Sequence, residues 1–141
     1  MWPVKFEDRL IQWSILRAEV KNLSLESSLN KINDWWQQTP WMPYHLHWDD
    51  QETWPNPWEL LSDNLFCDLA RSLGIVYTTM MVDHPDINNI ELASCEETNL
   101  VLINQGKYVL NWSPEELLNI STANIKIKKT LDSEKIRYLI G

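Results

Sequence analysis

Apolar residues at helical spacing predict two helices at the start of the chain. Residues 5–21 carry an apolar side chain at about every third or fourth position, which is typical of a helix with one buried face. Ser24 can cap a second helix, and this helix must end before Pro40 because a proline disfavours helical backbone in the residue before it. The sequence therefore predicts a helical region at residues 1–38.

A third helix is predicted from Pro57 to Leu73. Proline suits the first turn of a helix, and leucines then recur at every fourth position on one face. The leucines of this face are Leu61, Leu65, Leu69 and Leu73. Gly74 can adopt the left-handed backbone that ends many helices. Residues 75–83 are rich in β-branched and aromatic side chains and predict a strand.

Three more strands and a short helix are predicted next. Residues 89–96, 99–104 and 107–112 have the length and composition of strands. Residues 104–106 include a glycine that can close a hairpin between the last two of them. A serine, a proline and two glutamates then follow in the order that opens a helix, predicted at 114–120.

The C-terminal region is predicted as an edge strand and a final helix. Ile125 and Ile127 alternate with lysines, and Asp132 can cap a helix that runs to Ile140. These elements predict an α+β fold, in which N-terminal helices pack on a small antiparallel sheet. We expect a single domain over residues 1–141. It comprises a helical region (1–38), a Trp/Pro-rich segment (39–57), a core of helix and sheet (58–120), and a basic tail strand and helix (121–141).

The composition narrows the class of protein. Hydrophobic residues make up 44% of the chain and charged residues 23%, as in soluble globular domains. No apolar run reaches the roughly 20 residues of a membrane-spanning helix, and the N-terminus lacks the features of a secretion signal. The net charge of −8 argues against binding to nucleic acid. We therefore expect a protein that is not secreted and that contacts neither membrane nor nucleic acid.

Nine tryptophans are the unusual feature of the composition. Six of them lie between positions 35 and 58, in a stretch whose four prolines prevent one regular element. These indoles can cover a core that has only two phenylalanines, or they can form an aromatic face that binds a protein partner. Candidate partner contacts are Trp41, Trp48, Trp54 and Trp58. A carbohydrate-binding platform is a third hypothesis.

Basic residues concentrate near the C-terminus. Lys126, Lys128 and Lys129 lie in a segment with few acidic residues. This segment can dock on an acidic partner surface, or it can be a solvated edge strand whose lysines prevent aggregation.

Residues 58–75 and 100–112 resemble the core of transglutaminase-like cysteine enzymes. The first segment, WELLSDNLFCDLARSLGI, ends in the leucine-glycine-isoleucine step that closes the nucleophile-bearing helix of this family. The second, LVLINQGKYVLNW, is similar to the hairpin that follows the family's histidine and precedes its aspartate. The resemblance spans roughly residues 25–120 and implies a transglutaminase-like fold.

The same resemblance assigns three reaction positions. Counting back from Gly74 over the length of the family's helix places the cysteine position at Glu59. The histidine position falls on Thr98 or Asn99, and the aspartate position falls on Asn111. None of these side chains can form a thiolate–imidazolium pair. The resemblance therefore implies a catalytically inactive scaffold that is retained for binding or assembly.

The two cysteines allow an alternative. Cys67 is predicted to lie well inside the third helix, where the helix dipole activates a thiol little. Cys95, with His84 as base and Asp86 as orienting group, would make a small cysteine hydrolase or amidase. The segment from His84 to Asp86 can equally be a simple turn.

A metal site is suggested by His45 and His47. Alternating histidines on an extended segment point the same way, and Asp49 and Asp50 follow them. The aromatic neighbours of these histidines fit side-chain packing equally well. The three glycines of the chain provide no phosphate-binding loop, and we expect no cofactor and no small-molecule substrate.

Residues 53–81 also resemble small proteins of tailed bacteriophages, particularly of T4-like cyanophages. The resemblance depends on the run from Trp54 to Trp58 and on the helix that follows it. It implies a tail or baseplate component of the virion, or an assembly factor, that binds phage structural subunits in the host cytoplasm. The leading hypothesis is therefore a non-catalytic structural or assembly protein that acts by protein–protein contact.

Overall fold

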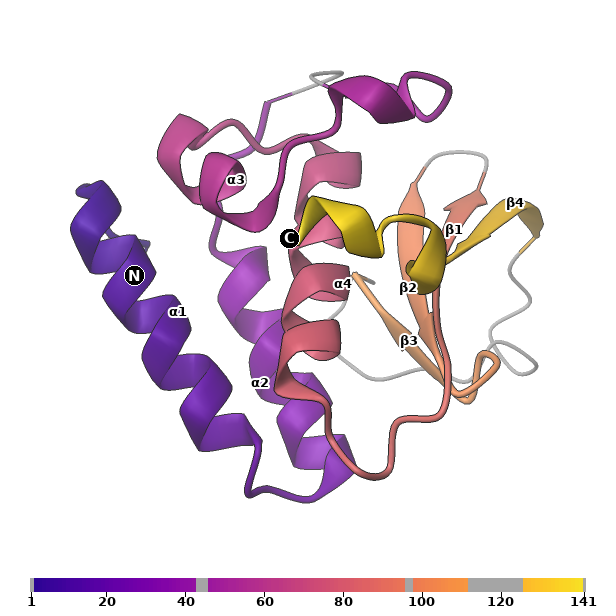
Figure 1. The fold of residues 1–141 in the computed structure, drawn as a ribbon, viewed down its shortest axis with the longest axis horizontal. Coiled ribbons are helices and arrows are strands. Elements are labelled where there is room, and N and C mark those ends of the chain that lie inside the picture. Colours follow the sequence, from indigo (N-terminus) through magenta and orange to yellow (C-terminus); the bar gives the residue numbers. More distant parts are fainter. Residues whose placement is uncertain (1, 43–45, 96–97, 112–125, 141) are drawn as a thin grey trace.

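A computed structural model describes residues 2–42, 46–95, 98–111 and 126–140. In these residues, helices pack against a four-stranded antiparallel sheet, which confirms the predicted α+β class. Helix α4 (Asp68–Val82) lies between the other helices and the sheet (Figure 1). It contacts α1, α2 and α3, and also strands β1 and β2, so it is the central element of the core.

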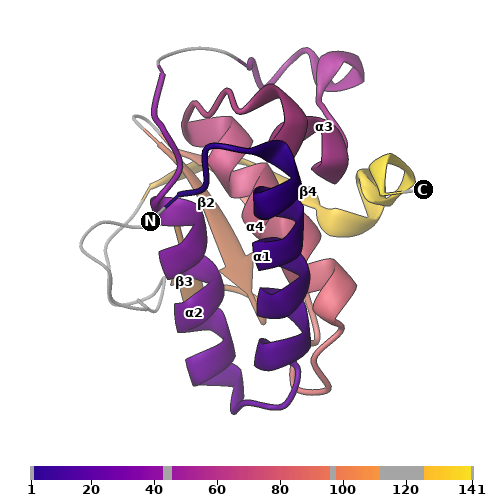
Figure 2. The same cartoon turned by 90° about the vertical axis from the view of Figure 1, so that its left-hand side faces the viewer.

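The two predicted N-terminal helices are confirmed. Helix α1 spans Phe6–Val20 and helix α2 spans Leu25–Gln37. Ser24 caps α2, because its hydroxyl accepts the backbone N–H of Ser27 at 3.3 Å. The two helices lie side by side and both pack against α4 (Figure 2).

The single helix predicted from Pro57 to Leu73 is wrong, because this part of the chain forms two helices. Helix α3 (Pro57–Asp63) ends at Asn64, whose left-handed backbone (φ 57°) breaks the helical path. The chain then runs through Leu65, which is 40% exposed and does not belong to the leucine stripe of the core. Helix α4 starts afresh after Cys67.

The strand predicted at 75–83 is instead the second half of α4. Gly74 lies within this helix, and a Cβ atom there would be 2.5 Å from a ring carbon of Trp36. Glycine is therefore needed for close packing of α4 on α2, and it does not end the helix. Because α4 is buried on nearly all sides, it lacks a polar face and its β-branched residues favour the strand prediction.

The tryptophans of the helices belong mainly to the core. Trp13 and Trp36 are fully buried, and both indole N–H groups donate to the hydroxyl oxygen of Thr78 at 2.9 Å. That hydroxyl in turn donates to the carbonyl of Gly74 at 2.7 Å. One threonine of α4 thus satisfies the polar atoms of two large side chains from α1 and α2.

The sheet confirms the other predicted strands. Its strands are β1 (Ile90–Cys95), β2 (Asn99–Ile103), β3 (Tyr108–Leu110) and β4 (Ile127–Asp132), in the spatial order β3-β2-β1-β4. The hairpin between β2 and β3 has left-handed backbone at Asn104, Gln105 and Gly106. Strand β4 lies at an edge and carries exposed lysines, as the sequence predicts.

The C-terminal end differs from its prediction. The predicted helix at 114–120 lies outside the described residues. The final helix is replaced by two short 3-10 turns, η2 (Ser133–Lys135) and η3 (Arg137–Leu139), so its prediction was wrong. Ile136 separates the turns, since its backbone is not helical and its buried side chain anchors the break in the core. None of the helices in the described ranges is long and apolar enough to span a membrane.

Candidate functional site

Cys67 lies at the amino end of α4, where it is the N-cap residue. Its Sγ accepts the backbone N–H of Leu46 at 3.3 Å and that of Ala70 at 3.5 Å. The residue is only 3% exposed, so the thiol lies under the segment that contains Leu46. The sulfur therefore takes the place of a capping oxygen and faces the positive end of the helix dipole.

The bounds of α4 differ from those from which the resemblance counted the cysteine position. The helix that contains Gly74 begins at Asp68, so the residue at its amino end is Cys67. Glu59 lies in α3, where it and Asn56 cap the helix reciprocally at 2.8 and 3.0 Å. The sequence predicted Cys67 well inside a helix. This prediction was wrong, because Cys67 precedes the first residue of α4. The sequence signal that could have revealed this is Asn64, a residue that tolerates the left-handed backbone.

A half-buried cation, Arg71, lies one turn further along α4. The guanidinium of Arg71 donates to the hydroxyl of Thr39 at 3.0 Å and to its carbonyl at 3.4 Å. Burial lowers the pKa of Arg71, whereas the neighbouring charges of Asp68 and Cys67 act in the opposite direction. Arginine stays protonated under all ordinary conditions, so a fixed positive charge lies beside the thiol.

Asp68 connects the start of α4 to the sheet. Its Oδ2 accepts the hydroxyl of Thr98 at 2.9 Å and also the backbone N–H of Asn99. Its Oδ1 accepts the side-chain amide of Asn111 at 3.2 Å. Since Asn99 begins β2 and Asn111 follows β3, one carboxylate joins three separate segments.

Asn111 is held through its backbone N–H and through both polar atoms of its side chain. Its backbone N–H donates to the side chain of Asn33 at 2.7 Å, and its Oδ1 accepts from Gln37 at 2.9 Å. Its Nδ2 also donates to the carbonyl of Asn99 at 2.8 Å. The residue is 6% exposed, so it acts as a buried joint between α2, α4 and the sheet.

The structure thus places Thr98, Asn99 and Asn111 at the amino end of α4, in contact with Asp68. An amide side chain neither accepts nor releases a proton near neutral pH. Both hydrogen bonds to the sulfur that the structure describes come from backbone amides. Among the described residues, the site therefore has a thiol without a general base in hydrogen-bond contact.

The alternative group of Cys95, His84 and Asp86 is not brought together. Cys95 lies at the end of β1 near Asp68, and both burial and the charge of Asp68 raise the pKa of its thiol. His84 follows the other end of α4, where its Nε2 lies 2.8 Å from the carbonyl oxygen of Leu23 and its Nδ1 accepts the N–H of Asp86. A helix of 15 residues, about 22 Å long, separates the two ends. The turn interpretation agrees with these contacts.

The structure describes only one histidine of the suggested metal site. His45 lies outside the described residues, and His47 is exposed with its carbonyl bonded to the indole of Trp54 at 2.9 Å. Asp49 forms an ion pair with Lys129 at 3.2 Å. Within the described ranges, no group of three His, Cys, Asp or Glu side chains could hold a metal ion.

The candidate partner contacts differ in exposure. Trp54 is 3% exposed and belongs to the core, and Trp48 packs on it with ring centroids 5.9 Å apart. Trp41 and Trp58 are 64% and 41% exposed, so they remain free for a partner. The lysines of the tail segment are all exposed: Lys126, Lys128 and Lys129.

The fold is similar to that of LapG from Legionella pneumophila, a transglutaminase-like cysteine protease. The TM-score is 0.69, and the likeness covers 89% of this chain and 75% of LapG. No protein-family model and no curated protein sequence matches the chain. At 15% identity, the likeness to LapG shows the fold alone. The chain therefore has a transglutaminase-like α+β fold, as its two resembling segments imply.

Proposed function

We propose that this chain is a non-catalytic protein of transglutaminase-like fold that binds a protein partner beside Cys67. The observation that supports this most is that amides occupy the two positions where the resemblance expects a histidine and an aspartate, at the start of β2 and just after β3. Asn99 and Asn111 are both bonded to Asp68, so neither is free to adopt another role. A thiol without a proton acceptor is a poor nucleophile at neutral pH.

Exposed apolar side chains flank the covered thiol and support the binding role. Trp41 forms an isolated parallel bridge with Phe66, the residue before Cys67. Met42 reinforces it by donating its N–H to the carbonyl of Phe66 at 2.8 Å. Trp41, one of the two bridge residues, is 64% exposed, and Leu65, which precedes Phe66, is 40% exposed. An exposed indole held by a rigid backbone is a suitable anchor for a partner.

A small cysteine hydrolase is the second candidate. The position of Cys67 at the N-cap of α4 favours it, because helix amino ends activate thiols. The likeness to the fold of a cysteine protease is compatible with it. This candidate requires a general base that does not appear among the hydrogen-bond partners described for Cys67 Sγ.

A peptide library separates the two candidates. The full chain and the variant Cys67→Ser, whose hydroxyl can replace the capping sulfur, are incubated with mixed peptides. New peptide termini are then counted by mass spectrometry. We expect equal, background cleavage in both, since the thiol has no base. Cleavage by the wild type that disappears in Cys67→Ser would establish the hydrolase instead.

The binding role is tested with the same library by affinity capture. Trp41→Ala should weaken retention of bound peptides by about tenfold or more, because an aromatic anchor contributes at least that much. Tyr138→Ala, at an aromatic side chain that is 64% exposed and is not a candidate contact, is the matched control. Thermal unfolding of both variants checks that the fold is intact. Retention that Trp41→Ala leaves unchanged would contradict a contact at this position.

The phage setting remains a separate hypothesis. A tail or baseplate role and assembly in a host cytoplasm are supported by the resemblance of residues 53–81 to small phage proteins. A carbohydrate-binding module is the remaining alternative, and the exposed indoles Trp41 and Trp58 are its candidate platform.

A further inference from the structure

Helix α1 carries apolar side chains on both of its faces. Its inner face buries Trp13, Leu16 and Val20 in the core. On its outer face Ile11 and Ile15, four positions apart, are 56% and 58% exposed. In Figure 2 this helix lies in front, and no other described element covers it. Isoleucine forms helices less readily than most polar residues, so helix formation alone does not explain this exposed pair.

The neighbouring helix α2 differs from α1 in this respect. All of its exposed side chains are polar: Glu26, Ser27, Lys31 and Asp34. A polar outer face is the usual pattern of a helix that covers a core, whereas apolar residues on both faces are typical of a helix with a second contact. The outer face of α1 is therefore expected to be covered by a partner.

The outer face of α1 follows the spacing of a coiled coil. Asp8, Ile11, Ile15 and Ala18 are all exposed and are separated by three, four and three positions. Residues at this spacing form a seam that packs against the seam of a second helix. When two copies of α1 run antiparallel about a twofold axis centred on position 13, Ile11 of each copy packs on Ile15 of the other. In the same arrangement Asp8 lies opposite the small side chain of Ala18.

The charged residues that flank the seam fit this antiparallel arrangement. On one flank Glu7 lies opposite Lys21 of the second copy, and on the other flank Lys5 lies opposite Glu19. The twofold axis repeats each of these pairs of opposite charge. In a parallel arrangement Asp8 would instead face Asp8 of the second copy at the seam, where like charges repel. The charges therefore select the antiparallel arrangement of two identical helices.

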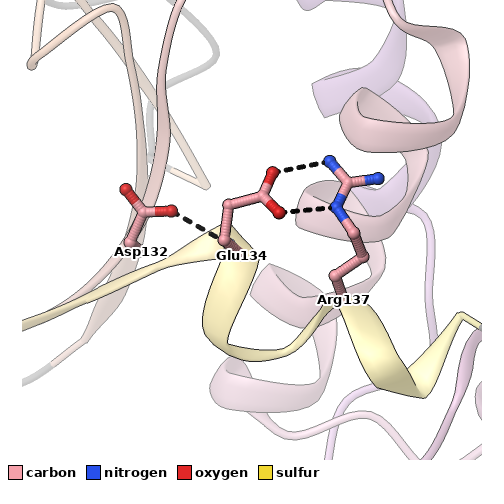
Figure 3. Close-up of polar contacts among 3 residues, drawn as sticks. All are labelled: Asp132, Glu134 and Arg137. Atoms are coloured by element: carbon pink, nitrogen blue, oxygen red, sulfur yellow. Dashed lines mark hydrogen bonds and ion pairs between the residues drawn. The ribbon is translucent and has the colours of Figure 1, made fainter.

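These flanking charges are available to a second copy. Elsewhere, exposed charges pair within the chain, as at the C-terminal turns, where Glu134 accepts hydrogen bonds of 2.7 and 2.8 Å from Arg137 (Figure 3). Three of the four flanking residues of α1 form no ion pair with any residue that the structure describes: Lys5, Glu7 and Lys21. Glu19 pairs with Lys31 of α2, but its side chain is 47% exposed and can accept a second cation.

We propose that two copies of this chain associate through the outer faces of α1, which run antiparallel about a twofold axis. Both copies use the same surface, so the assembly closes at the dimer. The apolar seam is short, and we therefore expect a reversible dimer and not a permanent one. The seam shares no residue with the partner site beside Cys67, so this inference is independent of the proposed function.

Sedimentation equilibrium of the full chain tests the proposal under reducing conditions. Salt at about 0.15 M screens the net repulsion between two acidic copies. We expect the average mass to rise from 16.7 kDa toward twice that value between roughly 10 μM and 1 mM. The double variant Ile11→Gln, Ile15→Gln should stay monomeric over this range, because glutamine removes the apolar seam but favours a helix. A wild type that stays monomeric, or a double variant that associates equally well, would overturn the proposal.

An exchange of charges tests the antiparallel arrangement. Glu7→Lys places like charges opposite each other at both ends of the seam, and it should raise the Kd of the dimer about tenfold. The double variant Glu7→Lys, Lys21→Glu should restore the Kd, since opposite charges face each other again. Both substitutions oppose the helix dipole, so a more stable helix cannot explain the restored dimer.

Glu52→Lys, in the short turn η1 (Gln51–Thr53), is the charge-matched control and should leave the Kd unchanged. Equal weakening by Glu7→Lys and Glu52→Lys would show an effect of net charge only and would overturn the proposal, as would a double variant that does not restore the dimer. Trp41→Ala should dimerise as the wild type does. Loss of the dimer in Trp41→Ala would place the contact beside Cys67 and would also overturn the proposal.

Discussion

At the scale of single residues, Asp68 determines how the site is built. Its carboxylate receives donors from β2 and from the residue after β3, so it holds the two amides beside the thiol. The hairpin between Asn99 and Asn111 could be predicted from the sequence, because it is marked by its own turn residues. The role of Asp68 could not, since it depends on where α4 begins.

Asp68→Asn should destabilise the fold. The new amide keeps one acceptor but places an N–H₂ group against the donors of Asn99 or Asn111. We expect a loss of about 1–3 kcal/mol in the free energy of unfolding, measured with urea. Asp63→Asn, at the exposed end of α3, is the control and should change stability by less than about 0.5 kcal/mol. Equal stability of the two variants would mean that the bonds of Asp68 contribute nothing.

The buried hydroxyl of Tyr77 should make the folded protein less stable at high pH. Its hydroxyl donates to the carbonyl of Pro55 at 2.7 Å, and burial raises its pKa well above the ordinary value. The protonated form is thus favoured in the folded state. Its contribution is fully present below the ordinary tyrosine pKa of about 10 and is lost as the pH rises above it.

Tyr77→Phe should therefore cost about 1 kcal/mol of unfolding free energy at pH 7. Above about pH 10 the difference from the wild type should shrink, because only the wild type must keep this hydroxyl protonated in order to fold. Tyr138→Phe, at a residue that is 64% exposed, serves as the control. A gap between Tyr77→Phe and wild type that stays constant with pH would refute the linkage.

At the scale of elements, α4 positions the residues of the candidate site. Cys67 caps its amino end, and His84 lies beyond its carboxyl end. The sequence predicted a helix and then a strand here. Glycine often ends a helix, so Gly74 was expected to do so, and several of the residues that follow it are β-branched. Neither signal reveals that Trp36 of α2 occupies the space beside Gly74. Amphipathic α1 and α2, whose patterns are local, were predicted correctly.

Gly74→Ala tests this packing. Helix propensity alone would favour alanine by roughly 1 kcal/mol. The clash with the ring of Trp36 should outweigh that gain and give a net loss of about 1–3 kcal/mol, measured by chemical denaturation. The same substitution in a Trp36→Phe background should cost less, because the smaller ring leaves room. A Gly74→Ala variant as stable as the wild type would contradict the close approach.

At the scale of the whole molecule, the fold could be predicted although its central helix was misassigned. The resemblance depends on the leucine-glycine-isoleucine step and on the β2–β3 hairpin. The hairpin is present, whereas the step lies inside α4 and does not end it. The start of α4 could not be predicted from the sequence. It depends on the left-handed backbone of Asn64, which ends α3, and on the bridge between Trp41 and Phe66. The expected cysteine position, Glu59, was counted from a helix that was predicted to begin at Pro57, whereas the helix that contains Gly74 begins at Asp68.

Single-turnover acylation of Cys67 tests most directly whether this fold has lost its chemistry. Intact-mass measurements follow the full chain and Cys67→Ser after mixing with p-nitrophenyl acetate. We predict that Cys67 is acylated no faster than free cysteine, with no burst of nitrophenolate above that of Cys67→Ser. A stoichiometric burst, followed by hydrolysis of an acyl group on Cys67 with a bell-shaped pH dependence, would contradict the loss of a general base.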